Sequence, residues 1–96
     1  MIDLQDSYRK QIIEAVNRHL SEAEVLIYGS RVKGTAKPYS DVDIIIKSNR
    51  RINESVLADI RDELSDSDIP YIIDLSDWHS LSDAFKSVIS DSCKLL

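Results

Sequence analysis

The sequence predicts an α+β domain in which four helices pack on a small mixed sheet of three strands. Apolar residues recur every third or fourth position in three long segments, as in amphipathic helices, and three short apolar runs alternate with them, as in buried strands. The chain has 96 residues, of which 43% are hydrophobic, and this is enough for one modest core. We therefore expect a single domain over residues 1–96.

The three long helices are defined by their apolar stripes. They are expected over residues 3–20, over residues 53–64 or 55–64 (Asn53 and Ser55 are both possible starts), and over residues 81–96. The stripes are Leu4, Tyr8, Ile12, Val16 and Leu20 in the first; Val56, Leu57, Ile60 and Leu64 in the second; and Leu81, Phe85, Val88, Ile89 and Cys93 in the third. Cys93 is accordingly expected to be a buried thiol.

Strands are expected over residues 24–28, 41–47 and 71–75. The first ends at Gly29-Ser30, whereas the second begins at Asp41. For both to line one site, the end of the first must lie near the beginning of the second, which makes the two strands antiparallel. The second strand should be central, because it must also neighbour the strand that carries Asp74.

Asp41 and Asp43 are the first candidates for a functional role. Alternate strand residues point to the same face, so the two carboxylates should project together, with Cα atoms roughly 7 Å apart. Carboxylates this close repel each other unless a divalent cation lies between them. Oxygen ligands of this kind suit magnesium or manganese.

The Gly29-Ser30 turn before them has the features of a phosphate site. Glycine allows a close backbone approach, and Ser30 is expected to cap a short helix over residues 31–36, whose free N–H groups would attract an anion. Arg31, Lys33 and Lys37 add three cations in a chain of net charge −5. This combination indicates a polyphosphate beside a metal; the alternative is a solvated loop followed by an aspartate-rich strand start.

Asp74 is the expected third carboxylate. It lies inside an otherwise apolar strand, where burial without a partner would be costly. The alternative is that Asp74 only caps a turn with Ser76. Asp77 competes for the same role, but it follows the apolar run, where a helix cap is the simpler interpretation.

The aromatic and histidine side chains receive no catalytic role. Trp78 is expected to cover the core edge, and Tyr39 could pack in its loop or stack on a base. His19 is expected at the surface, and His79 has no assigned role.

Composition excludes several classes of protein. The chain has 12 basic and 17 acidic residues and a pI of about 4.8, so it lacks the basic balance of proteins that coat nucleic acid. The single cysteine excludes an internal disulfide and a cysteine-based zinc cluster. Neither a membrane-spanning apolar run nor a signal peptide is found, and a cytoplasmic protein is expected.

Gly29-Ser30, ten intervening residues and Asp41-Val42-Asp43 together resemble the signature of the minimal nucleotidyltransferase (MNT) family, small members of the DNA polymerase β-like nucleotidyltransferase superfamily. The resemblance covers nearly the whole chain, because the other elements also follow the family's order. One departure is that family members often carry Ala-Arg where this chain has Val32-Lys33. Lysine binds phosphate as a point charge, without the bidentate fork of arginine.

The resemblance implies a polymerase β-like palm fold and metal-dependent nucleotide transfer. Asp41, Asp43 and Asp74 would hold two Mg²⁺ ions, with Mn²⁺ as a possible substitute, and Asp74 would also take the acceptor's proton. The nucleotide-binding residues would be Gly29, Ser30, Arg31 and Lys33.

The same resemblance implies a biological role. Family members commonly pair with a HEPN-domain toxin, a small helical ribonuclease, and neutralise it by moving AMP from ATP onto a toxin tyrosine. We therefore expect ATP and a cognate HEPN toxin as partners in a hetero-oligomer, without direct nucleic-acid binding. Two alternatives remain open: an antitoxin that acts by binding alone, and a nucleotidyltransferase that modifies a small-molecule hydroxyl. The lack of an acceptor domain favours a protein acceptor.

Overall fold

The fold is built on one mixed sheet, which a computed structural model describes for residues 2–38 and 40–96. Its strands are β1 (Glu24–Tyr28), β2 (Val42–Lys47), β3 (Ile73–Asp77) and β4 (Lys94–Leu95), in the order β3-β2-β1-β4. β1 runs antiparallel to β2 and to β4, whereas β2 and β3 are parallel. The antiparallel first pair and the central place of the second strand confirm the sequence prediction.

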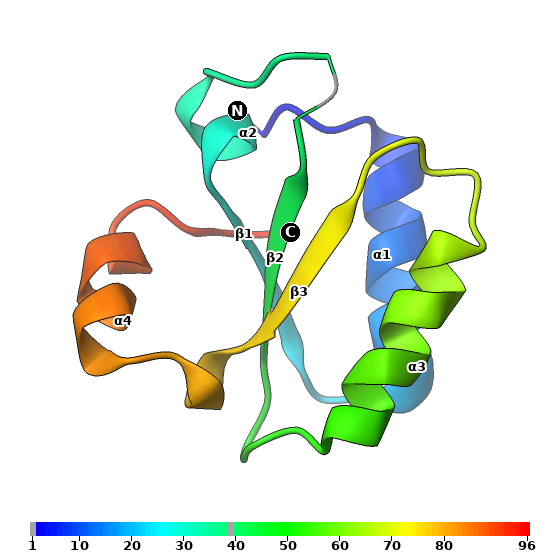
Figure 1. Cartoon of the computed structure of the whole chain (residues 1–96), viewed down its shortest axis with the longest axis vertical. Coiled ribbons are helices and arrows are strands. Elements are labelled where there is room, and N and C mark those ends of the chain that lie inside the picture. The colour runs from blue at the N-terminus through cyan, green and yellow to red at the C-terminus, as the bar shows by residue number, and fades with distance from the viewer. Residues whose placement is uncertain (1, 39) are drawn as a thin grey trace.

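The helices surround this sheet (Figure 1). They are α1 (Asp6–His19), α2 (Ser30–Lys33), α3 (Glu54–Ser65) and α4 (Asp83–Ser90), with a short 3-10 helix, η1 (Trp78–Ser80), after β3. Asn53 is the N-cap of α3, because its side-chain oxygen accepts from the Ser55 N–H at 3.0 Å. α1 starts three residues later than expected, at Asp6.

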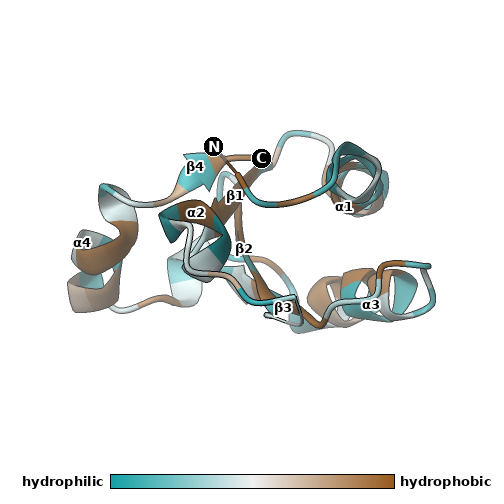
Figure 2. Cartoon of the chain, turned by 90° about the horizontal axis from the view of Figure 1, so that it is seen from above, coloured by the Kyte–Doolittle hydropathy of each residue, from teal (hydrophilic) through white to brown (hydrophobic). Residues whose placement is uncertain are grey.

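The two faces of the sheet are covered differently. α1 and α3 lie on one side, and α2 and α4 on the other (Figure 2). The main core fills the space under α1 and α3 and includes the fully buried Ile12, Val16, Ile27, Val42, Ile44, Ile46 and Ile60. On the opposite face Ile45 and Ile89 are buried, and Tyr28 meets Phe85 of α4 edge to face at 5.8 Å. The second face is covered only in part, which leaves room for a site.

The C-terminal segment differs from its prediction as one helix over residues 81–96. α4 ends at Ser90, and the chain then extends so that Lys94–Leu95 pairs with β1. The Leu96 N–H donates to the Val25 carbonyl at 2.8 Å, and the Leu96 side chain is buried. Strand pairing satisfies the free edge of β1, which a longer helix would leave open. Cys93 is consequently only half-buried, and Val88 is exposed.

The third strand is shifted two residues beyond its expected bounds of 71–75. The cause is Asp77, which is only 2% exposed because its carboxylate accepts from the backbone N–H groups of Ile52 at 2.9 Å and His79 at 3.1 Å. It is the N-cap of η1, which confirms the interpretation of Asp77 as a cap. Each of the two carboxylate oxygens of Asp77 thus accepts a hydrogen bond, which allows this side chain to be buried at the end of the strand.

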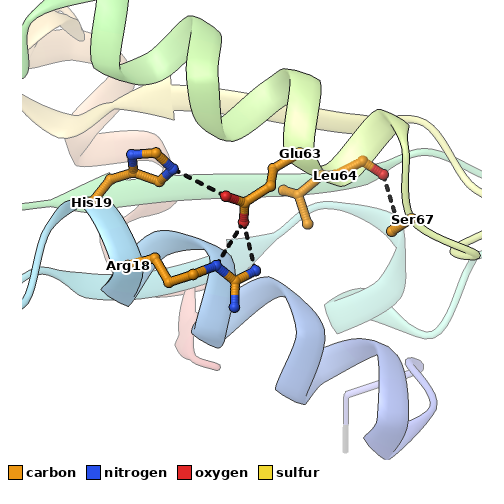
Figure 3. Close-up of polar contacts among 5 residues, drawn as sticks. All are labelled: Arg18, His19, Glu63, Leu64 and Ser67. Carbon is orange, nitrogen blue, oxygen red and sulfur yellow. Dashed lines mark hydrogen bonds and ion pairs between the residues drawn. The ribbon is translucent and has the colours of Figure 1, made fainter.

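A surface ion cluster joins the two helices that cover the main core (Figure 3). The Glu63 carboxylate of α3 accepts from the Arg18 guanidinium of α1 at 2.5 and 3.0 Å and lies 3.2 Å from the His19 ring. We call Arg18, His19 and Glu63 the α1–α3 ion cluster.

No helix within residues 2–38 and 40–96 has the length and apolar character needed to cross a membrane.

Candidate active site at the carboxylate end of the sheet

The sheet register brings the candidate carboxylates together. Asp43 of β2 is paired with Asp74 of β3 and, on its other side, with Tyr28 of β1. Residues paired across neighbouring strands project from the same face. Asp41 lies two residues before Asp43, immediately ahead of β2. We call Tyr28, Gly29, Asp41, Asp43 and Asp74 the carboxylate site.

The electrostatics of this site are those of crowded negative charge. Burial raises the pKa of Asp43, and the carboxylates of Asp74 and then Asp41 raise it further. The pKa of Tyr28 is also raised, first by burial and then by Asp43 and Asp74. The Tyr28 hydroxyl therefore stays protonated at neutral pH and can donate a hydrogen bond.

Gly29 positions the turn against Asp43. It has φ of +83°, a conformation that side-chain-bearing residues rarely adopt. A Cβ built on Gly29 would lie 2.5 Å from Oδ2 of Asp43. Only a glycine therefore lets the backbone of the turn approach the carboxylate this closely.

Ser30 differs from its expected role as a helix cap. α2 is one turn long, Ser30–Lys33, instead of residues 31–36, and its N-cap is Gly29, with no side-chain cap hydrogen bond. Gly34 ends the helix in the left-handed conformation. Ser30 is half-buried, whereas Lys33 and Lys37 are exposed. The hydroxyl of Ser30 is thus not used to cap α2.

Arg31 is not placed as a phosphate ligand, and this corrects its predicted role. It is only 4% exposed. Its guanidinium donates to the carbonyl of Asp3 at 2.9 Å and to that of Ser40 at 2.8 Å, and it lies 4.0 Å from the centre of the Tyr71 ring. The cation is turned into the protein, so Lys33 and Lys37 are the exposed cations near the turn.

Asp74 lies beside Asp43, although the burial argument that singled it out was wrong. Its side chain is exposed, because β3 is the outermost strand and the carboxylate is on the incompletely covered face. Ile72, two residues earlier, is 71% exposed. A ligand or partner can therefore reach Asp74 from solvent.

The donor set of the carboxylate site suits a hard divalent cation. Three carboxylates meet at one end of the sheet, where burial and then the charges of Asp74 and Asp41 raise the pKa of Asp43. Within residues 2–38 and 40–96, no three His, Cys, Asp or Glu side chains are already arranged to enclose an ion. The fit therefore concerns the chemistry of the donors alone.

Two features of the site were not found from the sequence. Tyr28 was assigned only to the first strand, yet an antiparallel pair that ends at Gly29 and resumes near Asp41 places Tyr28 opposite Asp43. The inward turn of Arg31 has no sequence signal.

Trp78 lies near Lys47 at the far end of β2, and the His79 ring is bonded to the Ser48 carbonyl. Tyr39 lies outside the described residues.

Comparisons with known proteins agree with this geometry. The family described as polymerase beta, nucleotidyltransferase matches residues 10–96. A probable protein adenylyltransferase MntA of Haemophilus influenzae is 40% identical over 65 residues, which are 68% of this chain and 57% of the relative. This chain thus matches little more than half the length of that protein.

Solved structures share the fold at lower identity. A crystal structure of a toxin–antitoxin with AMP-PNP has a TM-score of 0.76 at 21% identity, over 90% of this chain and 69% of that one. A tri-AMPylated Shewanella oneidensis HEPN toxin in complex with an MNT antitoxin has a TM-score of 0.72 at 18% identity, over 96% and 71%. Together with the family match over residues 10–96, the fold and the Gly-Ser/Asp-x-Asp geometry show that the chain belongs to the polymerase β-type nucleotidyltransferase family.

Proposed function

We propose that this protein is an antitoxin that transfers AMP from ATP to a tyrosine hydroxyl of a HEPN-domain toxin, with Mg²⁺ as cofactor. The observation that carries the proposal is the pairing of Asp43 with Asp74 beside a glycine turn that only Gly29 can form. The relative named as a protein adenylyltransferase and the toxin–antitoxin complexes of the same fold support the acceptor class.

The nucleotide would be bound at the turn. The Ser30 hydroxyl, which α2 does not use as a cap, and the backbone beside Gly29 would contact the triphosphate. Lys33 is exposed on the same turn and would neutralise phosphate charge. Asp41 and Asp43 would hold two Mg²⁺ ions with help from Asp74. Bound metal would neutralise charge on the attacking and leaving oxygens of an in-line displacement.

The residues of the carboxylate site divide the remaining work. The acceptor's hydroxyl oxygen forms a bond to the α-phosphorus while the bond from that phosphorus to the bridging oxygen breaks, and pyrophosphate leaves. The hydroxyl proton passes to Asp74, which is open to solvent at the outer strand. The Tyr28 hydroxyl stays protonated and would donate to a carboxylate of the site. The exposed Ile72 offers an apolar contact next to Asp74 for an aromatic acceptor.

The test is the intact mass of the toxin. The product of the neighbouring gene, which the proposal expects to be a HEPN-domain toxin, would be co-expressed with the wild type and with the Asp41→Ala/Asp43→Ala variant. We expect AMP adducts on a tyrosine with the wild type and none with the variant. Identical toxin masses, with neutralisation intact in both, would show an antitoxin that acts by binding alone. Transfer to a small molecule with no toxin adduct would support the other alternative.

A further inference from the structure

The buried guanidinium of Arg31 connects segments that are far apart in the sequence. Nη1 donates to the Asp3 carbonyl, Nη2 donates to the Ser40 carbonyl, and the central carbon Cζ lies 4.0 Å from the centre of the Tyr71 ring. The Asp3 N–H donates in return to the Arg31 carbonyl at 2.8 Å. One side chain therefore contacts the N-terminal segment, the loop before β2 and the approach to β3.

Arg31 itself and two of the three segments that it contacts lead directly to residues of the carboxylate site. Arg31 follows Gly29-Ser30 in the chain, Ser40 precedes Asp41, and Tyr71 lies three residues before Asp74. The segments that lead to Asp41 and Asp74 are also joined to each other, because the Val42 N–H donates to the Ile72 carbonyl at 2.9 Å. Movement of the guanidinium would therefore change the spacing between the turn and the carboxylates.

We infer that Arg31 is a positioning residue that sets the geometry of the nucleotide site by tying together the segments that carry Gly29-Ser30, Asp41 and Asp74, without contacting the nucleotide. This inference deepens the proposed function and rests on it for the catalytic part of its test.

The chemistry of the contacts requires arginine. The planar group donates in two directions while its face stacks on Tyr71, whereas a lysine ammonium has no plane to stack and less reach between the two carbonyls. Burial of the cation is costly, and the buried Nε has no hydrogen-bond partner among the residues that the structure describes. The charge is held by carbonyl dipoles and the ring of Tyr71, and Tyr71 is itself packed edge to face on Tyr8 of α1.

The first test uses amide hydrogen exchange of the metal-free protein and needs no activity. In Arg31→Lys we expect the amides of Asp3 and Val42 to exchange at least about tenfold faster, as the loss of hydrogen bonds to a charged group predicts. Amides at the far end of the β1–β2 pair, Val25 and Ile46, should be unchanged. Lys33→Met is the matched control, since it removes an exposed cation from the same helical turn and should leave the exchange rates as in the wild type.

The second test separates positioning from phosphate binding by kinetics. A phosphate ligand would be largely replaced by lysine, which keeps the charge. A positioning residue would not, and we expect Arg31→Lys to lower kcat by about 10²-fold, as a displacement of about 1 Å can, while KM for ATP changes less than about threefold. Lys33→Met should instead raise KM for ATP.

The outcomes are distinguishable. Unchanged exchange at Asp3 and Val42 in Arg31→Lys, or a loss confined to KM for ATP, would overturn the positioning role. If Arg31→Lys fails to fold, Tyr71→Leu takes its place, because it removes the stacking partner and should reproduce the faster exchange. If the wild type transfers no nucleotide, the proposed function fails, but the exchange experiment still decides whether Arg31 ties the segments.

Discussion

Asp43 in the carboxylate site and Glu63 in the α1–α3 ion cluster are carboxylates in opposite surroundings. Asp43 has two carboxylates as neighbours and a raised pKa. Glu63 accepts hydrogen bonds from Arg18 and His19, and its pKa is lowered, first by the bond from Arg18. The carboxylate of the α1–α3 ion cluster has cationic partners within the chain, whereas Asp43 has other carboxylates as its neighbours. Like charges gathered in this way are typical of functional sites, whereas a carboxylate paired with a cation is typical of a structural contact.

The arginines of the two regions show the same contrast. Arg18 is exposed and paired with a carboxylate, as surface arginines commonly are. Arg31 is buried, and among the described residues its guanidinium donates to two carbonyls and lies over an aromatic ring, although carboxylates lie on neighbouring segments. An inward Arg31 leaves the negative charge of the carboxylate site available to a cation. The following experiments test this contrast between the two regions.

The largest effect is expected from Asp43→Asn. Removal of a carboxylate proposed to hold metal should lower the rate of AMP transfer by on the order of 10³-fold or more, while the fold is retained. The measurement is the transfer rate to the toxin together with a thermal melt. Glu63→Gln is the control and should transfer at the wild-type rate. A folded Asp43→Asn protein with normal transfer would remove Asp43 from the site.

Gly29→Ala and Gly34→Ala form a matched pair for the second prediction. Both glycines have positive φ, +83° and +77°, but an added Cβ meets Asp43 only at Gly29 and finds nothing within 4 Å at Gly34. We expect Gly29→Ala to cost about 2–3 kcal/mol of unfolding free energy and most of the activity, and Gly34→Ala about 1 kcal/mol with activity retained. Equal losses of stability and activity in chemical denaturation and transfer assays would contradict the close approach of Gly29 to Asp43.

The third prediction concerns the pH dependence of metal-free stability. The pKa of Asp43 in the folded protein is raised above its usual 3.8, so the folded state binds this proton more tightly than the unfolded state does. Ionisation therefore costs stability as pH rises from below 3.8 through the folded pKa, and the cost is complete at neutral pH.

Asp43→Asn should accordingly melt about 2–5 °C above the wild type at pH 7, after allowance for solvent screening. The gain should vanish below the usual carboxylate pKa. Saturating Mg²⁺ should reverse the order, because it stabilises only the protein that binds it. A melting temperature of Asp43→Asn below that of the wild type at pH 7 without metal would contradict the proposed cost of ionising Asp43, which burial and then the neighbouring carboxylates cause.

The smallest effect is expected from Glu63→Gln. Because the pKa of Glu63 is lowered in the folded protein, its ionised carboxylate stabilises the fold above pH 4.5. This contribution is lost as the pH falls through the pKa of the folded state. The variant should therefore melt slightly below the wild type at pH 7, opposite in sign to Asp43→Asn, and the difference should shrink in high salt because the pair is exposed. Glu22→Gln, another exposed carboxylate, serves as the control, and an equal drop there would show that the α1–α3 ion cluster contributes nothing specific.

The elements of the fold that depend on local pattern could be predicted from the sequence. The first strand was predicted at its observed bounds, Glu24–Tyr28. The apolar stripes predicted for the first two long helices contribute Leu4, Ile12, Val16, Leu57, Ile60 and Leu64 to the main core. The Gly-Ser turn and the Asp-x-Asp pair identified the family that the match over residues 10–96 confirms. These features need only residues close together in the chain, where backbone geometry limits the alternatives.

Other features depend on contacts between residues that are distant in the sequence, and these could not be predicted. The segment after Ser90 forms β4 because the free edge of β1 is available to it. The sequence of that segment has no pattern that would indicate this pairing. Asp74 was selected for an expected burial, but it lies beside Asp43 because of the parallel register of β2 and β3. Arg31 turns inward because Asp3, Ser40 and Tyr71 meet around it. A local pattern specifies which groups a segment offers, whereas the packed fold decides which of them are satisfied internally and which remain free for a ligand.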